Sequence, residues 1–149
     1  MAWVRPIYDR KQEDVDEAIK KLNEWITTGE TSVTDLKGCF NASDMNRIEG
    51  NIKYLSDTLN GLYYFSTVTT KTWGKDGLPT VTDINRLIAN VNKIITAYHQ
   101  SSSAPSLPTT LTTFEEVNDL EENLYRLKTL LDNMIQAFPE CGAYTCGEG

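Results

Sequence analysis

The chain has 149 residues, with 14 Lys+Arg against 21 Asp+Glu and a net charge of −7. This length fits one domain spanning residues 1–149, and an apolar fraction of 40 % suffices for a buried core. The acidic balance argues against binding to the nucleic-acid backbone, which needs a cationic surface. No apolar run approaches the roughly 18 residues of a membrane span, and the N-terminal residues lack the features of a signal peptide. We therefore expect neither nucleic acid nor a membrane as a partner.

Apolar residues recur at steps of three and four, the spacing that places them on one side of a helix. The predicted helices lie at about 12–27, 43–60, 82–99 and 114–138. Side chains suited to cap helix N-termini stand near three of these starts: Ser43, Thr82 and the capping-box pair Thr113 and Glu116. Residues that end helices stand near three of the predicted C-termini: Gly29, Gly61 and Pro139.

The connections between these helices are long and rich in Thr, Ser, Gly and Pro. Residues 63–70 have the composition of a strand, so they form either a short edge strand or an extended segment across the helices. Residues 101–108 contain two prolines and are expected to lie extended on the surface. The predicted fold is all-α, with about four helices in a repeat-like bundle, long extended connections, and a minor strand pair left open.

Three of the helices share a pattern in which an acidic residue, an apolar residue and Asn are followed by a second Asn five positions later. The asparagine pairs are Asn46 and Asn51, Asn85 and Asn90, and Asn118 and Asn123. Because asparagine is a poor helix former, its repetition needs a reason. The first of each pair can satisfy free N–H groups at the helix start, and the second can hold the backbone of a connection. We predict that at least two of Asn51, Asn90 and Asn123 hydrogen-bond to backbone outside their own helix.

Trp73 lies in a Gly- and Pro-rich loop, and two roles compete for it. It either folds onto the helices and pins the 63–81 connection, or stands exposed as a contact for another chain. The preference of large apolar side chains for burial favours pinning. The other large apolar groups expected to help hold the connection are Tyr63, Phe65 and Leu78.

Groups suited to metal or acid–base chemistry are few. Cys39, Cys141, Cys146 and His99 have the composition of a zinc site, but no Cys-x-x-Cys spacing groups them. We interpret them as ordinary thiols of a reducing compartment and a histidine favoured at a helix end. Serines follow His99, but a catalytic triad also needs an orienting carboxylate. We expect no catalytic residue, metal or cofactor, and therefore no enzyme.

The repeat and its surroundings resemble a helical module of tail-associated (fibre or baseplate) virion proteins from phages and prophages of Gram-positive bacteria. The resemblance covers almost the whole chain and is carried by residues 3–7, 9–10, 14–15, 37–49, 51–56, 72–73, 79–80, 83 and 118–131. Lys11 stands where the module has Thr, so Asp9 becomes the candidate cap of the first helix, and Cys39 replaces a small residue. The resemblance implies no enzymatic activity. It implies a virion location after synthesis in the host cytoplasm, with tail proteins and further copies of the chain as partners.

These expectations converge on a non-enzymatic structural or adaptor protein of a phage or prophage tail, acting by protein–protein assembly. The alternative is a small acidic effector of mobile-element origin that inhibits a host nucleic-acid-binding protein by charge mimicry. A mimic needs a contiguous acidic face, whereas acids and bases interleave along each predicted helix. A hydrolase using His99 would need a pocket around that residue.

Overall fold

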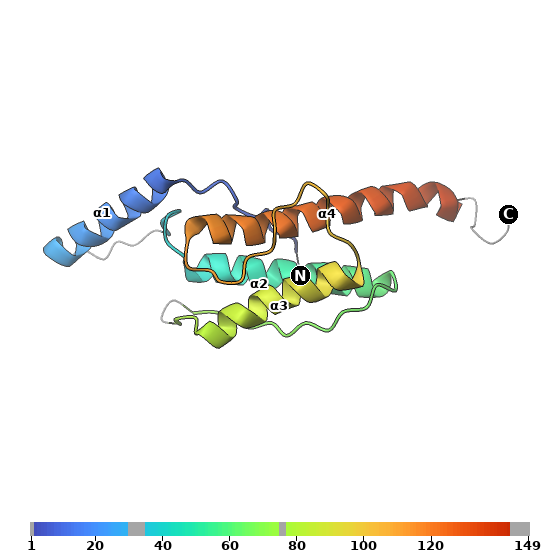
Figure 1. The fold of residues 1–149 in the computed structure, drawn as a ribbon, viewed down its shortest axis with the longest axis horizontal. Helices are drawn as coiled ribbons and strands as arrows, with labels where there is room; N and C mark the ends of the chain where they lie inside the picture. Colours follow the sequence, from blue (N-terminus) through green and yellow to red (C-terminus); the bar gives the residue numbers. More distant parts are fainter. Residues whose placement is uncertain (1, 30–34, 75–76, 144–149) are drawn as a thin grey trace.

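Three parallel helices and the extended segments between them form the body of the protein (Figure 1). The computed structural model describes residues 2–29, 35–74 and 77–143, and side chains as far as residue 137. Its helices are α1 (Gln12–Thr28), α2 (Ala42–Gly61), α3 (Val81–Ala97) and α4 (Phe114–Ala143). Helices α2, α3 and α4 pack against one another and run in the same direction, whereas α1 projects from one end. The prediction of an all-α fold with about four helices is confirmed.

The long connections follow from the parallel arrangement, because the chain must return along each helix before the next one can start. Segment 2 (residues 62–74 and 77–80) and segment 3 (residues 98–113) make these returns (Figure 1). Segment 1 (residues 2–11) is also extended and precedes α1. The bundle thus has three units, each an extended segment followed by a helix, with α1 inserted into the first. The alternative of an edge strand at 63–70 is wrong: no described residue is in a strand.

The apolar stripes of α2, α3 and α4 meet in one core that also takes in a residue of segment 2. Burying each large aliphatic side chain contributes about 1.5–3 kcal/mol, so this core dominates the stability of the bundle. Within α1, Ala18 is the buried residue, and it is not part of this core. The core residues are Met45, Ile48, Ile52, Leu55, Leu59, Trp73, Leu87, Val91, Ile94, Leu120, Leu124, Leu127 and Leu131.

All four helices begin with the same device, in which a carboxylate accepts the backbone N–H of a residue three positions earlier. The pairs are Lys11 with Asp14, Asn41 with Asp44, Thr80 with Asp83, and Thr113 with Glu116. The predicted capping box at Thr113 is confirmed, since its Oγ1 accepts from Glu116 N at 3.3 Å. The proposal that Asp9 caps α1 is wrong, because the N-cap residue is Lys11, whose N–H donates to the Asp14 carboxylate at 2.9 Å.

Two other predicted caps lie inside their helices. Ser43 and Thr82 are helical residues, because Asn41 and Thr80 start α2 and α3 two residues earlier. The sequence placed several oxygen-bearing side chains in a row, and only the folded chain selects which one adopts the extended N-cap conformation.

The predicted helix ends are partly right. Gly29 ends α1 with a φ of 70°, a left-handed conformation that glycine adopts without a steric penalty. Gly61 is the last residue of α2. Pro139 does not close α4, which continues to Ala143. Proline keeps a φ compatible with the helix, so it removes one backbone hydrogen bond without ending the element here.

Candidate functional site

The second asparagine of each pair holds an extended segment through its side-chain amide. Asn51 Nδ2 donates to Val4 O at 2.7 Å, and Asn51 Oδ1 accepts from Val4 N at 3.0 Å. Asn90 makes the same two contacts with Thr69, at 2.8 and 3.4 Å. Each amide thus pairs with both backbone groups of one residue, as a neighbouring strand would. We call this arrangement an asparagine clamp.

The third of these asparagines, Asn123, holds a proline residue. Asn123 Nδ2 donates to Pro105 O at 3.0 Å, but Pro105 has no N–H to offer in return. Gln100 Nε2 supplies the missing donor to Asn123 Oδ1 at 2.9 Å. All three second asparagines, Asn51, Asn90 and Asn123, are at most 1 % exposed and hydrogen-bond to backbone outside their own helix, as the sequence predicted for at least two of them.

Two of the first asparagines are clamps as well. Asn46 pairs with both backbone groups of Trp73, at 2.9 and 2.7 Å, and Asn118 does the same with Arg10, at 3.0 and 3.2 Å. The expectation that these side chains satisfy N–H groups of their own helix start is wrong, because their amides bind the backbone of Trp73 and Arg10 instead. Asn85, the equivalent residue of α3, is exposed.

One clamp was missed by the sequence analysis. Asn60 Nδ2 donates to Ser66 O at 3.2 Å, and Asn60 Oδ1 accepts from Ser66 N at 2.8 Å. Asn60 falls outside the repeated spacing. The spacing in the sequence could have identified this clamp. Asn60 lies 14 residues after Asn46, or about four helical turns, so both amides lie on one side of α2.

Trp73 is buried, with 5 % of its surface exposed. Its indole Nε1 donates to Glu49 Oε1 at 3.2 Å, and Lys71 Nζ lies 4.2 Å from the ring centre. Together with the Asn46 clamp on its backbone, these contacts fix segment 2 against α2. The structure therefore agrees with the pinning role and contradicts the exposed-contact role.

The other three residues that the sequence analysis assigned to holding this connection do not do so. Tyr63, Phe65 and Leu78 are 83 %, 69 % and 87 % exposed. The sequence analysis assigned them to packing because they were large and apolar, but the clamps and Trp73 already fix the segment. Their side chains are left at the surface.

Two seams between the helices contain ion pairs from equivalent repeat positions. Arg47 Nε of α2 lies 2.7 Å from Glu121 Oε1 of α4, and Arg86 Nη1 of α3 lies 3.0 Å from Glu49 Oε2 of α2. Arg47 and Arg86 directly follow the first asparagine of their repeats, and the two glutamates lie three positions after it. The side chains of Glu49 and Glu121 are 4 % and 0 % exposed, so the pairing offsets a large cost of burying charge.

The seam between α3 and α4 departs from this rule. The equivalent positions hold Ile88 in α3 and Asp119 in α4, which cannot form an ion pair. Partial burial raises the pKa of Asp119, and the nearby charges of Glu115 and Glu116 raise it further. The exposed Asn85 belongs to the same α3 repeat.

Segment 1 adds another charge to the α2–α4 seam. Arg10 lies 3.1 Å from Asp44 and 2.9 Å from Glu121, while Arg47 lies 2.6 Å from Asp44. Burial lowers the pKa of Arg47, but its contacts with Glu121 and Asp44 outweigh that effect and raise the pKa overall. Arg47 therefore remains charged, and the cluster joins segment 1, α2 and α4.

Helix α1 presents an apolar surface outside this clamped body. Ile19, Leu22 and Ile26 lie on one side of α1 and are 52 %, 42 % and 81 % exposed. The start of α1 is fixed by a close backbone approach. A Cβ atom at Gly38 would lie 2.0 Å from the carbonyl oxygen of Asp14, so a larger residue there would push α1 away.

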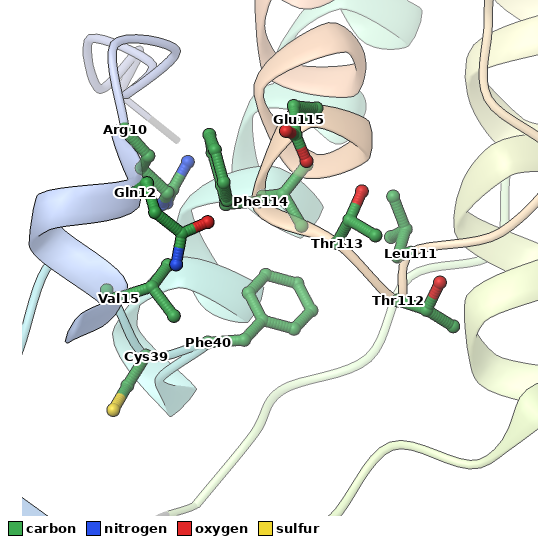
Figure 2. A pocket seen from close by; sticks show the side chains of 12 residues that line it. Arg10, Gln12, Val15, Cys39, Phe40, Leu111, Thr112, Thr113, Phe114 and Glu115 are labelled. Atoms are coloured by element: carbon green, nitrogen blue, oxygen red, sulfur yellow. The ribbon is translucent and has the colours of Figure 1, made fainter. Parts of the chain in front are cut away.

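A pocket of about 400 Å³ lies where α1 meets the start of α4 (Figure 2). Figure 2 shows Val15 of α1 facing the ring of Phe40, with Leu111 and Phe114 on the side of α4. Cys39 also lines this pocket, and partial burial, followed by the charge of Asp44, raises the pKa of its thiol. A raised pKa keeps this thiol protonated and weakly nucleophilic at neutral pH.

The zinc hypothesis concerns residues that lie far apart in the described chain or outside it. Cys39 is half-buried near the start of α2, and His99 is exposed after the end of α3. The side chains of Cys141 and Cys146 lie outside the described part of the chain. Among the described residues, no group of three or more His, Cys, Asp or Glu side chains could hold a metal ion.

None of the helices in the described residues has both the length and the hydropathy needed to cross a membrane. Comparison with known proteins gives no match to a family model, to a curated protein or to a solved structure.

Proposed function

We propose that this chain is a non-enzymatic structural or adaptor protein of a phage or prophage tail that acts by protein–protein assembly. The observation that carries the assembly role is the projecting helix α1, with Ile19, Leu22 and Ile26 exposed along one side. The core formed by α2, α3 and α4 includes no residue of α1, so the bundle does not use this helix to complete itself. A row of exposed aliphatic side chains on a projecting helix is typical of an interaction surface.

The rest of the molecule suits a rigid spacer. Asparagine clamps fix each extended segment at defined residues, and buried ion pairs fix two of the three seams. A body held at so many points presents α1 and the exposed side chains in constant positions. Assembly through preformed surfaces costs less conformational entropy than assembly through mobile ones. The tail location rests on the sequence resemblance alone.

Several carboxylates are engaged in contacts within the chain, and this disfavours the charge-mimic alternative. Asp14, Asp44, Asp83 and Glu116 bind helix N-termini, while Glu49 and Glu121 are buried in ion pairs. A nucleic-acid mimic has to present its negative charges on one surface. The negative charge available to such a surface is therefore smaller than the net charge of −7 suggests.

The experiment is to measure the mass of the full chain by size-exclusion chromatography with light scattering, from about 1 to 200 μM. We expect concentration-dependent association, and its loss in Leu22→Glu/Ile26→Glu. The control Lys20→Glu puts the same side chain on the opposite face of α1 and should associate normally. A monomer at every concentration, or association that the double variant leaves unchanged, would contradict self-assembly through α1.

The tail assignment has its own test. The genes that flank the coding gene should encode tail, baseplate or lysis proteins. A neighbourhood without virion genes would contradict the tail assignment and leave the association data to be explained by another partner.

A further inference from the structure

The outer face of α3 carries a clamp position that no described residue fills. Asn85 stands in its repeat where Asn46 and Asn118 stand in theirs, and both of those residues hold the backbone N–H and C=O of one residue. Asn85 is exposed and has no hydrogen-bond partner among the described residues. Its amide therefore presents a donor and an acceptor side by side to the solvent.

The reason lies in segment 3, the segment that would correspond to this clamp. Thr112 N and Thr113 N both donate to Glu116 Oε2, at 2.7 and 3.3 Å, so the end of segment 3 is bound to the start of α4. Pro105 and Pro108 remove two further backbone donors from the segment. Segment 3 thus leaves the amide of Asn85 without a partner among the described residues.

A shallow pocket of about 410 Å³ lies further along α3, between Asn92, Thr96 and the ring of Phe65. Phe65 is 69 % exposed, and its ring lies 6.1 Å from that of Tyr63 in an edge-on arrangement. Lys93 lines the pocket as well, and its Nζ donates to Thr67 O at 3.2 Å. The exposed residues that lead from the free clamp to this pocket form a row with steps of four, three and four: Asn85, Ala89, Asn92 and Thr96.

We infer that this row binds an extended polypeptide segment of a partner protein that carries an apolar or aromatic anchor. Asn85 pairs with both backbone groups of one residue, and an apolar or aromatic side chain of the segment enters the pocket beside Phe65. A partner helix cannot use the clamp, because its backbone N–H and C=O groups already bind each other. The inference rests on the proposed assembly function and names the kind of segment that this face recognises.

Segment 2 provides the spacing of the partner motif. Ser66 and Trp73 are seven residues apart and are clamped by Asn60 and Asn46, which are fourteen apart. One extended residue therefore spans two helical residues, as rises of about 3.3 and 1.5 Å predict. The pocket lies seven to eleven residues beyond Asn85. In the partner segment, the anchoring side chain thus lies about four or five residues from the clamped residue. If the segment runs antiparallel to α3, as segment 2 does, the anchor precedes the clamped residue in the sequence.

A suitable probe is a synthetic peptide with the sequence of residues 62–72, which contains Phe65 four positions before the clamped Thr69. Titration into the ¹⁵N-labelled full chain should shift the side-chain amide of Asn85 and the backbone amides of Asn92 and Thr96, with saturation below the millimolar range. Asn85→Ala should weaken binding about fivefold to tenfold, the loss expected for one or two exposed hydrogen bonds. The matched control Asn133→Ala removes another exposed asparagine and should bind the peptide normally.

Two altered peptides test the binding mode. Proline at the position of Thr69 lacks the N–H that Asn85 would accept, and alanine at the position of Phe65 lacks the anchor; each should weaken binding at least threefold. Absence of saturable shifts at millimolar peptide, or binding that Asn85→Ala or the proline peptide leaves unchanged, overturns the inference. The proposed function is tested separately, since Leu22→Glu/Ile26→Glu alters α1 and leaves this face intact.

Discussion

The α2–α4 seam and the α3–α4 seam use the same repeat positions with different chemistry. In the first, Glu121 is fully buried and accepts from Arg10, Arg47 and the backbone N–H of Ile7. In the second, the equivalent positions hold Ile88 and Asp119, without an ion pair. One seam therefore fixes its helices by directional contacts, and the other holds them by apolar packing.

This difference shows how much polar structure a parallel bundle needs. Apolar stripes alone allow helices to slide by a turn, whereas a buried ion pair is satisfied in one register. Two fixed seams place three helices, so the third seam is determined without a pair of its own. In this third seam Asn85 of the α3 repeat lies exposed at the surface.

The largest effect is expected from breaking the charged seam. Glu121→Ala leaves Arg10 and Arg47 buried without their shared carboxylate and should cost about 3–5 kcal/mol of unfolding free energy. The measurement is chemical denaturation monitored by circular dichroism. Glu122→Ala removes the neighbouring carboxylate, whose nearest cation is 3.7 Å away on the surface, and should cost less than about 1 kcal/mol. Equal losses in the two variants would contradict the role given to the seam.

Removal of Trp73 tests the neighbouring α2–α3 seam, where its indole binds Glu49. Trp73→Ala should cost about 3–5 kcal/mol, since it opens a cavity and leaves segment 2 unpinned. The association state of the folded fraction should not change, because Trp73 is buried. Phe65→Ala, on the same segment but exposed, should lose less than about 1 kcal/mol. Intact stability of Trp73→Ala with lost association would make this loop a contact surface.

The two asparagines of α3 give the sharpest matched pair. Asn90→Ala removes a buried clamp and leaves both backbone groups of Thr69 unpaired, which should cost about 1–3 kcal/mol. Asn85→Ala removes an exposed side chain and should change stability by less than about 0.5 kcal/mol. Thermal unfolding of the two variants side by side measures the difference. Similar destabilisation by both would show that Asn85 is already engaged.

The smallest effect concerns the pH dependence of the α3–α4 seam, which contains Asp119. The pKa of Asp119 is raised in the folded protein, mainly by burial, so its stabilising contribution is full below its unfolded pKa of about 3.9 and is lost as the pH rises through the folded value. Asp119→Asn should therefore raise the melting temperature slightly at pH 7, and the gain should vanish below about pH 4. Destabilisation at pH 7 would mean that the Asp119 charge has a partner.

The contribution of Glu116 to stability should show the opposite pH dependence. Hydrogen bonds from Thr112 N and other threonine groups lower its pKa, so its contribution is present above its unfolded pKa and is lost as the pH falls through the folded value. Glu116→Gln should lower the melting temperature at pH 7, with the difference disappearing in acid. Thermal scans of both variants between about pH 3 and pH 7 check the two signs together.

The helices and their core residues could be predicted from the sequence. Steps of three and four identify an apolar stripe regardless of what covers it, and the observed helix ends lie within two residues of the predicted ones, apart from the extension of α4 to Ala143. The asparagine repeat also carried usable information. A poor helix former at the edge of an apolar stripe needs a nearby partner, and the exposed backbone of a long connection is the obvious one.

Only the tertiary structure decided which residues meet. The sequence did not show that α2, α3 and α4 are parallel, and this arrangement determines which segment lies beside which amide. Asn46, Asn85 and Asn118 look alike in the repeat, yet two are clamps and one is exposed. Likewise, Trp73 is buried while Phe65 on the same segment is not. Periodicity is a local property of one helix, whereas burial and pairing depend on neighbours that the fold brings together from distant parts of the chain.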